Sequence, residues 1–166
     1  MTERGDLPAT GPILVSACLA GVPTRYDGTG THDHLVHRLV AEGRAVLVCP
    51  EVDGGLGTPR PPAEIVGGDG DAVLAGRARV MTKDGVDVTD AYVSGARAAL
   101  ATAQRAGATA AILKSRSPSC GSGQIYDGTH SRTLRSGDGV TVALLRSSGL
   151  TVFSDEDDAV ETQEGH

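Results

Sequence analysis

Three short apolar runs constrain the fold of this chain more than any other feature of its 166 residues. Each run has the length of one strand and shows no polar alternation, which is typical of strands buried on both faces of a parallel sheet. Each run also leads into a loop rich in glycine or proline, which marks the end of the strand. The three runs are residues 13–17, 45–48 and 109–113.

Helical periodicity after the first run predicts a helix that connects it to the second. Leu35, Leu39 and Val40 recur at helical spacing, so they are expected to form its buried face. Asp33 is placed as the N-cap, and Gly43 is placed as the C-terminal stop.

A longer helix is predicted before the third run, from Asp90 to about Ala106. Thr89 is placed as its cap and Gly107 as its end. The residues expected on its buried face are Val93, Ala96, Leu100 and Ala103.

The remaining segments complete an α/β pattern. Asp138 as a cap and Gly149 as a stop favour a helix over residues 140–146. The fold class is therefore α/β, a single Rossmann-like three-layer domain with a mostly parallel sheet. It lacks a Gly-x-Gly-x-x-Gly fingerprint, so a dinucleotide is not implied. The other segments are assigned as a long loop over 52–70, a strand pair within 72–82 and a last strand over 150–153.

Charge and composition limit the partners of this chain. The formal net charge is −6, aromatic residues make up 2% of the chain, and no run of Lys or Arg occurs, so a long nucleic acid is not an expected partner. No apolar run approaches the roughly 18 residues that span a bilayer, and no secretory signal is evident, so a cytoplasmic protein without a membrane partner is expected. The expected organisation is a flexible leader over 1–11, the α/β domain over 12–155 and an acidic disordered tail over 156–166.

The three cysteines follow the three runs. Cys18 comes directly after the first run, Cys49 directly after the second, and Cys120 ends the loop after the third. The carboxyl ends of parallel strands share one edge of the sheet, which is where such folds bind ligands. Thiolates that converge there suit zinc or an iron–sulfur cluster, although structural zinc normally has four ligands. The alternative is that one or more cysteines are small buried hydrophobic residues.

Several motifs around these cysteines resemble one known family, that of the bacterial 2-thiouracil desulfidases, formerly a domain of unknown function. The likeness runs in the family's order over roughly residues 12–155. The motifs that carry it are Val15-Ser-Ala-Cys-Leu-Ala-Gly21, Arg25-Tyr-Asp-Gly28, Cys49-Pro-Glu-Val52, Gly54-Gly-Leu56, Pro59-Arg60, Ala63-Glu-Ile65, Ser117-Pro-Ser-Cys-Gly121, Gly123-Gln-Ile-Tyr-Asp-Gly128 and Gly137-Asp-Gly-Val140.

The resemblance implies a [4Fe–4S] cluster on Cys18, Cys49 and Cys120, with the fourth iron left open. It also implies catalytic roles for Glu51 and Ser117, which occupy the matching motif positions. The implied reaction is hydrolytic removal of sulfur from a small thiolated pyrimidine, such as 2-thiouracil or a related thiouracil or thiouridine.

Charged residues near the motifs are candidates for substrate binding. Arg25 and Lys114, together with Arg116 and Arg60, are expected either to offset the anionic cluster or to bind pyrimidine oxygens, although each alone is more often a solvated surface charge. Asp27 is expected either to accept a hydrogen bond from a ring N–H or only to shape an Asp-Gly turn. The histidines His32, His34 and His37 suggest a metal site, but His34 and His37 are expected on a helix surface.

Two other classes of function are compatible with the same cysteines. One is a zinc-dependent or thiol-nucleophile hydrolase. The other is a non-catalytic module that carries sulfur or a cluster, against which the pair of Glu51 and Ser117 argues.

Overall fold

The computed structural model describes residues 7–156 of the chain. Most of the predicted leader and all but the first residue of the predicted tail lie outside this range. Within the described part, the carbonyls of Pro8 and Gly11 accept hydrogen bonds from Arg44. The elements are β1 (Ile13–Ser16), a 3-10 turn (Ala17–Leu19), α1 (His34–Ala41), β2 (Ala45–Val48), α2 (Pro50–Asp53), β3 (Ala63–Val66), α3 (Gly70–Leu74), β4 (Arg79–Thr82), α4 (Thr89–Ala106), β5 (Ala110–Leu113), β6 (Gln124–Tyr126), β7 (Leu134–Ser136), α5 (Val140–Ser147) and β8 (Thr151–Ser154).

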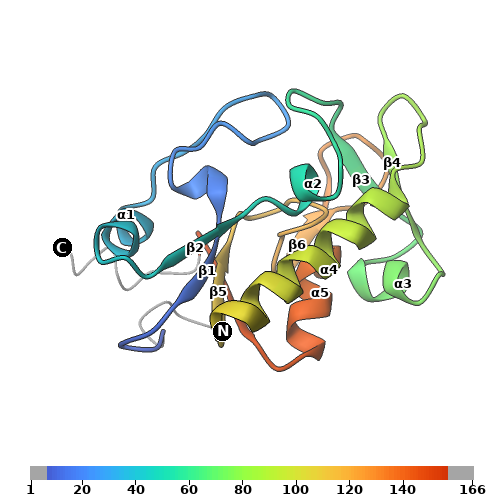
Figure 1. Cartoon of the computed structure of the whole chain (residues 1–166). Helices are drawn as coiled ribbons and strands as arrows, with labels where there is room; N and C mark the ends of the chain where they lie inside the picture. The colour runs from blue at the N-terminus through green and yellow to red at the C-terminus, as the bar shows by residue number, and fades with distance from the viewer. Residues whose placement is uncertain (1–6, 157–166) are drawn as a thin grey trace.

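The main sheet has four parallel strands in the order β2-β1-β5-β8, between two layers of helices. Successive strand residues point to opposite faces. Ile13, Ile112 and Phe153 pack with Val36 and Leu39 of α1 on one face. The other face packs against α4 and α5, through Leu14, Ala111, Val152, Ala99, Ala103, Val142 and Leu145. The predicted three-layer α/β domain is therefore confirmed, with α1 on one side and α4 and α5 on the other (Figure 1).

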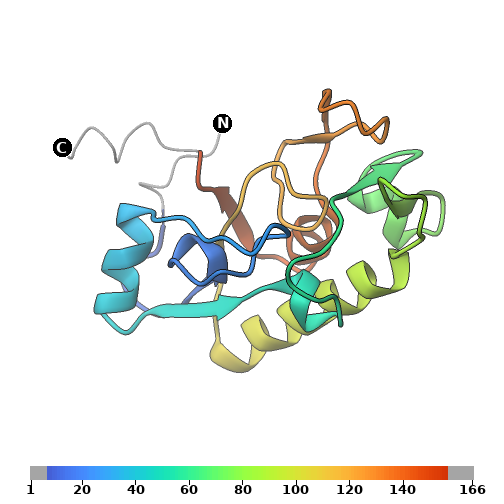
Figure 2. The same ribbon diagram turned by 90° about the horizontal axis from the view of Figure 1, so that it is seen from above.

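Two antiparallel hairpins, β3–β4 and β6–β7, lie at the far end of the molecule from α1 (Figure 2). They pack on a core of their own, in which Ile65, Val80 and Ile125 contact Tyr92 of α4 and Val140 of α5. The described part of the chain contains no helix long and apolar enough to cross a membrane.

The predicted strand pair within residues 72–82 is wrong. Residues 70–74 form α3, with Asp69 as the N-cap. Only β4 of that segment is a strand, and it pairs with β3, which the sequence analysis assigned to a loop. Four-residue strands joined by a short helix carry too little periodicity to be recognised from sequence.

Two predicted strand and helix faces also need correction. The second apolar run, β2, is an edge strand and not a buried one, since Leu47 is 42% exposed. In α1 the buried residues are Val36 and Leu39, whereas Val40 is 45% exposed. Asp33 does cap α1 by accepting a hydrogen bond from the Val36 N–H.

The predicted N-caps of the two later helices are wrong, whereas Gly107 does end α4 in a left-handed conformation. Thr89 is the first residue of α4, and its hydroxyl accepts a hydrogen bond from the Val80 N–H, so it ties the helix to β4. Gly139 and not Asp138 is the N-cap of α5. The carboxylate of Asp138 instead accepts hydrogen bonds from Gly123 and Arg146. The fully buried face of α4 consists of Tyr92, Gly95, Ala96, Ala99 and Ala103, with Val93 and Leu100 only partly buried.

Candidate active site

A cavity of about 450 Å³ opens at the carboxyl ends of β1, β2 and β5, and all three cysteines line it. Cys18 lies in the 3-10 turn after β1, Cys49 lies between β2 and α2, and Cys120 lies in the loop after β5. None of the three forms a disulfide. The parallel topology therefore brings side chains that are far apart in sequence to one edge of the sheet.

Hydrogen bonds fix the loops that carry Cys18 and Cys120. The Cys18 carbonyl accepts hydrogen bonds from the backbone N–H and the hydroxyl of Thr31. The Cys120 N–H donates to the hydroxyl of Ser117. Ser16, at the end of β1, connects to the loop of Cys120, because its hydroxyl accepts a hydrogen bond from the Lys114 N–H at the start of that loop.

Close backbone packing fixes the position of Cys49. Pro50 begins α2 directly after it, and α2 rests on α4. A Cβ atom at Gly95 of α4 would lie 1.8 Å from the Pro50 carbonyl oxygen, and one at Gly54 would lie 2.0 Å from the Ala91 oxygen. Glycine at these two positions is therefore required for the helices to approach closely enough.

Burial shapes the chemistry of the thiols. It raises the pKa of Cys18 to about 11, against the opposing effect of the nearby Lys114 and Arg25 cations. Burial also raises the pKa of Cys120, while the hydrogen bond from Ser16 opposes the rise. A cysteine nucleophile needs a lowered thiol pKa, so burial disfavours Cys18 and Cys120 as nucleophiles. A metal, in contrast, deprotonates the thiols that coordinate it.

Glu51 and Ser117 meet in the cavity wall between Cys49 and Cys120. The Ser117 hydroxyl donates to Glu51 Oε2 over 3.2 Å, and it accepts hydrogen bonds from the backbone N–H groups of Ser119 and Cys120. Since both acceptor sites of the hydroxyl are used, its proton points to the carboxylate. Ser117 thus both caps its own loop and orients Glu51.

Other predicted site residues divide into two groups. Arg25, Lys114 and Arg116 line the cavity; Lys114 lies 3.5 Å from Asp155, and Arg116 pairs with Glu156. Asp27 does not line it.

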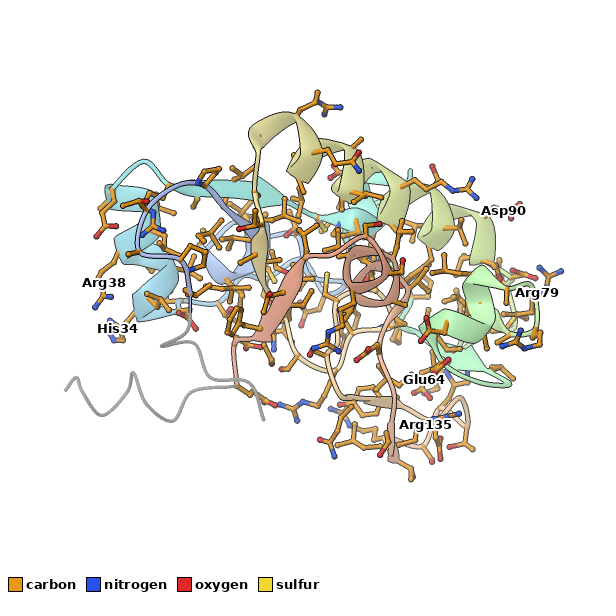
Figure 3. The ribbon with its side chains drawn as sticks, turned by 90° about the horizontal axis from the view of Figure 1, so that it is seen from below. His34, Arg38, Glu64, Arg79, Asp90 and Arg135 are labelled. Carbon is orange, nitrogen blue, oxygen red and sulfur yellow. The ribbon has the colours of Figure 1, made fainter. Side chains whose placement is uncertain are left out.

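The Asp27 carboxylate shapes a turn, because it accepts hydrogen bonds from the backbone N–H and the hydroxyl of Thr29. Asp127 and Thr129 form the same turn independently. His34 lies exposed on α1 (Figure 3), and the rings of His32 and His37 stack on each other away from the cavity.

The cavity includes residues that sequence reasoning missed. Tyr92 of α4 is buried beside Glu51; burial first, and then the Glu51 charge, raise its pKa well above the ordinary value. The helical spacing of Tyr92 from Ala96 and Ala99 was the sequence signal that could have placed it on the buried face of α4. Lys83 directly follows β4, and His130 and Arg132 lie in the loop between β6 and β7; none of the three carries a comparable sequence pattern.

Glu64 of β3 holds the loop that carries His130 and Arg132 over the cavity. It is 8% exposed, and its Oε1 accepts hydrogen bonds from the N–H groups of Gly128 and His130. His130 and Arg132 both have positive φ, 58° and 64°, which non-glycine residues rarely adopt without such support. Figure 3 shows Glu64 at the hairpin end of the molecule, away from His34 and Arg38 of α1.

The donor set fits an iron–sulfur cluster better than a single ion. A mononuclear zinc site gathers its ligands within about 2.3 Å of one point. Among residues 7–156, no three His, Cys, Asp or Glu side chains are close enough together to hold one metal ion. A cluster distributes its thiolate ligands over separate iron atoms, so three thiols around one cavity suit it. Lys114 and Arg25 would offset its negative charge.

The fold and the cavity define a class: an α/β protein that presents three thiols at the strand ends, suited to a metal cofactor, beside a carboxylate and a hydroxyl. A family model described as 2-thiouracil desulfurase matches residues 13–157. The chain therefore belongs to the 2-thiouracil desulfurase family.

Two individual proteins are similar to the chain. An uncharacterized protein, YbbK, of Bacillus subtilis (strain 168) is 50% identical over 145 residues, which are 87% of this chain and 96% of YbbK. The solved structure of a [4Fe-4S]-dependent thiouracil desulfidase, TudS, superposes with a TM-score of 0.80 at 45% identity and covers 94% of this chain and 97% of TudS. The similarity to TudS supports the predicted α/β fold.

Proposed function

We propose that this protein is a [4Fe–4S]-dependent desulfidase that hydrolyses a thiolated pyrimidine to the oxo-pyrimidine and sulfide. The observation that carries the proposal is the meeting of three thiols, Glu51 and Ser117 around one cavity. The similarity to TudS, a [4Fe-4S]-dependent thiouracil desulfidase, supports the same cofactor and substrate class.

Cys18, Cys49 and Cys120 would hold the cluster. A [4Fe–4S] cluster held by three cysteines supplies, when bound, one iron free of protein that acts as a Lewis acid toward the thiocarbonyl sulfur. In the overall reaction, water provides the oxygen that replaces sulfur, and both of its protons leave with the sulfide. No electrons are transferred, so no reductant or oxidant is required.

Glu51 is the proposed general base and general acid. Its carboxylate takes a proton from the attacking water and then returns a proton to the departing group. Ser117 holds Oε2 of that carboxylate through a 3.2 Å hydrogen bond, so the other lone pairs of this oxygen stay available to water. The contact between these two side chains favours an enzyme over a module that only carries sulfur or a cluster.

Arg25 and Lys114 are the proposed binding residues for the pyrimidine oxygens, since both line the cavity beside Cys18. Asp27 is not retained for this role, because it faces Thr29. Lys83 and Arg132 also line the cavity, and neither forms an ion pair with any residue that the structure describes. These unpaired cations, on a chain of net charge −6, favour a substrate that carries an anionic group beyond the ring, such as a phosphorylated thiouridine.

The direct test is turnover of 2-thiouracil in H₂¹⁸O by anaerobically prepared, cluster-loaded protein. The proposal predicts equal amounts of uracil and sulfide without added reductant, and one ¹⁸O atom in each uracil. Turnover that requires a reductant, or uracil without ¹⁸O, would show that the reaction is not hydrolytic. No turnover of 2-thiouracil, thiouridine or phosphorylated thiouridine would reject the substrate class.

A further inference from the structure

Arg60 is the most extensively hydrogen-bonded side chain at the edge of the cavity. Its Nε donates to Glu51 Oε1 over 2.8 Å, and one terminal nitrogen donates to the Thr24 carbonyl over 2.9 Å. The other terminal nitrogen donates to the Gly57 carbonyl and the Thr58 hydroxyl, both over 3.0 Å. Four of the five guanidinium N–H groups are thus used inside the protein.

These contacts join three segments of the cavity wall. Thr24 lies in the loop that follows Cys18, Glu51 lies in α2 after Cys49, and Thr58 precedes Arg60 in the loop between α2 and β3. The side chain of Arg60 is 7% exposed and that of Glu51 is 13% exposed, so the pair is largely removed from solvent. An ion pair with this burial and several added hydrogen bonds holds its geometry far better than an exposed one.

Such bonding excludes a substrate-binding role for the guanidinium. A pyrimidine oxygen would find one N–H group free, and that group belongs to the nitrogen already committed to Thr24. Instead, the two oxygens of the Glu51 carboxylate have different partners. Oε1 accepts a hydrogen bond from Arg60, whereas Oε2 accepts one from Ser117.

We propose that Arg60 is a positioning residue that fixes the Glu51 carboxylate so that Oε2 is presented to the reacting water. This inference rests on the proposed role of Glu51. Lysine cannot replace Arg60, because an ammonium group is a point charge without the planar fork that reaches Glu51 and two loops together. Small misplacement of a general base costs rate and leaves substrate affinity unchanged.

The test is a double-mutant cycle on cluster-loaded protein. For Arg60→Lys we expect kcat to fall about 10- to 100-fold with KM within about twofold, which is the size of effect that misplacement of a catalytic group produces. For Arg60→Lys combined with Glu51→Gln we expect no further loss beyond Glu51→Gln alone, because Arg60 acts through Glu51. Arg77→Lys, at an exposed arginine outside the cavity, is the matched control and should leave kcat unchanged.

A second measurement is independent of turnover. In the ¹H–¹⁵N spectrum of wild-type protein, the Arg60 Nε–H should exchange slowly with solvent, and Glu51→Gln should shift its resonance and speed its exchange. If Arg60→Lys does not fold, Thr58→Val is the alternative variant, because it removes the hydroxyl that accepts a hydrogen bond from the terminal nitrogen of Arg60 that does not bind Thr24. This variant should speed the exchange of the Arg60 Nε–H and lower kcat about two- to fivefold.

Additive losses in the cycle, a raised KM with normal kcat, or an Arg60 Nε–H signal unaffected by Glu51→Gln would each overturn the positioning role. A wild-type protein that shows the Arg60–Glu51 coupling by NMR but no turnover would instead reject the proposed function and leave the coupling itself established.

Discussion

Two regions of the molecule line the same cavity and reach it by different means. The strand-end region carries Cys18, Cys49 and Cys120 at the carboxyl edge of the parallel sheet. The hairpin region carries Lys83 in the turn after β4, and His130 and Arg132 in the loop between β6 and β7. The first is positioned by the topology of a buried sheet, and the second by loop hydrogen bonds such as those of Glu64.

This difference matches the division of tasks in the proposed function. The proposed cofactor ligands, which must keep a fixed spacing, follow the ends of strands of the main sheet. The proposed contacts to the periphery of the substrate lie on loops farther from that sheet, and loops change more readily. Substitutions in the strand-end region should therefore abolish the cofactor or the chemistry, and substitutions in the hairpin region should change substrate binding alone.

The largest effect is expected from the cysteines. Cys18→Ser, Cys49→Ser and Cys120→Ser should each remove bound iron and activity while the fold is retained, since a hydroxyl is a harder and far less acidic ligand than a thiol. Metal analysis and circular dichroism after anaerobic reconstitution measure both properties. Val86→Ser, at an exposed site outside the cavity, is the control. Wild-type iron content in any of the three variants would remove that cysteine from the ligand set.

The next largest effect is expected from Glu51→Gln, which keeps the size of the side chain and removes the carboxylate that accepts a proton. The cluster should remain, and kcat should fall by about 10²–10⁴, the usual contribution of general acid–base catalysis. Steady-state release of uracil, normalised to iron content, is the measurement, and Glu42→Gln at an exposed site is the control. A variant as fast as wild type would refute the acid–base role, whereas lost iron would show that Glu51 supports the cluster.

A smaller effect, on binding alone, is expected from Glu64. Glu64→Leu removes the acceptor for two backbone N–H groups of the loop that carries His130 and Arg132, so KM should rise about tenfold with kcat and iron content unchanged. Glu64→Gln should behave nearly as wild type, because its amide oxygen can accept the same two hydrogen bonds. Loss of iron or a lower kcat in Glu64→Leu would contradict the claim that the hairpin region affects substrate binding alone.

The smallest effect is expected from Lys83→Ala. An exposed charge contributes at most about 1 kcal/mol, so KM for a phosphorylated thiouridine should rise no more than about fivefold, with no change for free 2-thiouracil. The exposed Arg97→Ala, on α4 outside the cavity, should change neither value. Equal increases for both substrates would show that Lys83 does not recognise an anionic group.

The comparison also explains how much the sequence could predict. The strands β1, β2 and β5 were predictable because each is an apolar run that ends at a loop, and parallel strand ends meet at one edge. The grouping of the cysteines around one cavity follows from that rule. The orientation of α4 was harder to predict, because apart from Tyr92 its buried face consists mainly of small residues, and the larger Val93 is not fully buried.

The hairpin region could not be predicted in the same way. Strands of three or four residues show no clear period, and the positive φ angles of His130 and Arg132 depend on Glu64, which is more than 60 residues away in sequence. The link between Arg60 and Glu51 likewise depends on how the loop after α2 folds back. Contacts of this kind arise from tertiary packing, for which a single sequence carries no local signal.

The most direct test of the central claim is the metal and sulfide content of the anaerobically reconstituted protein. Three thiols at the strand ends that hold a [4Fe–4S] cluster predict about four iron atoms and four acid-labile sulfides per chain, with no zinc. The variant that combines Cys18→Ser, Cys49→Ser and Cys120→Ser should contain neither iron nor sulfide. One zinc per chain in the wild type, or iron that persists in the triple variant, would contradict the account.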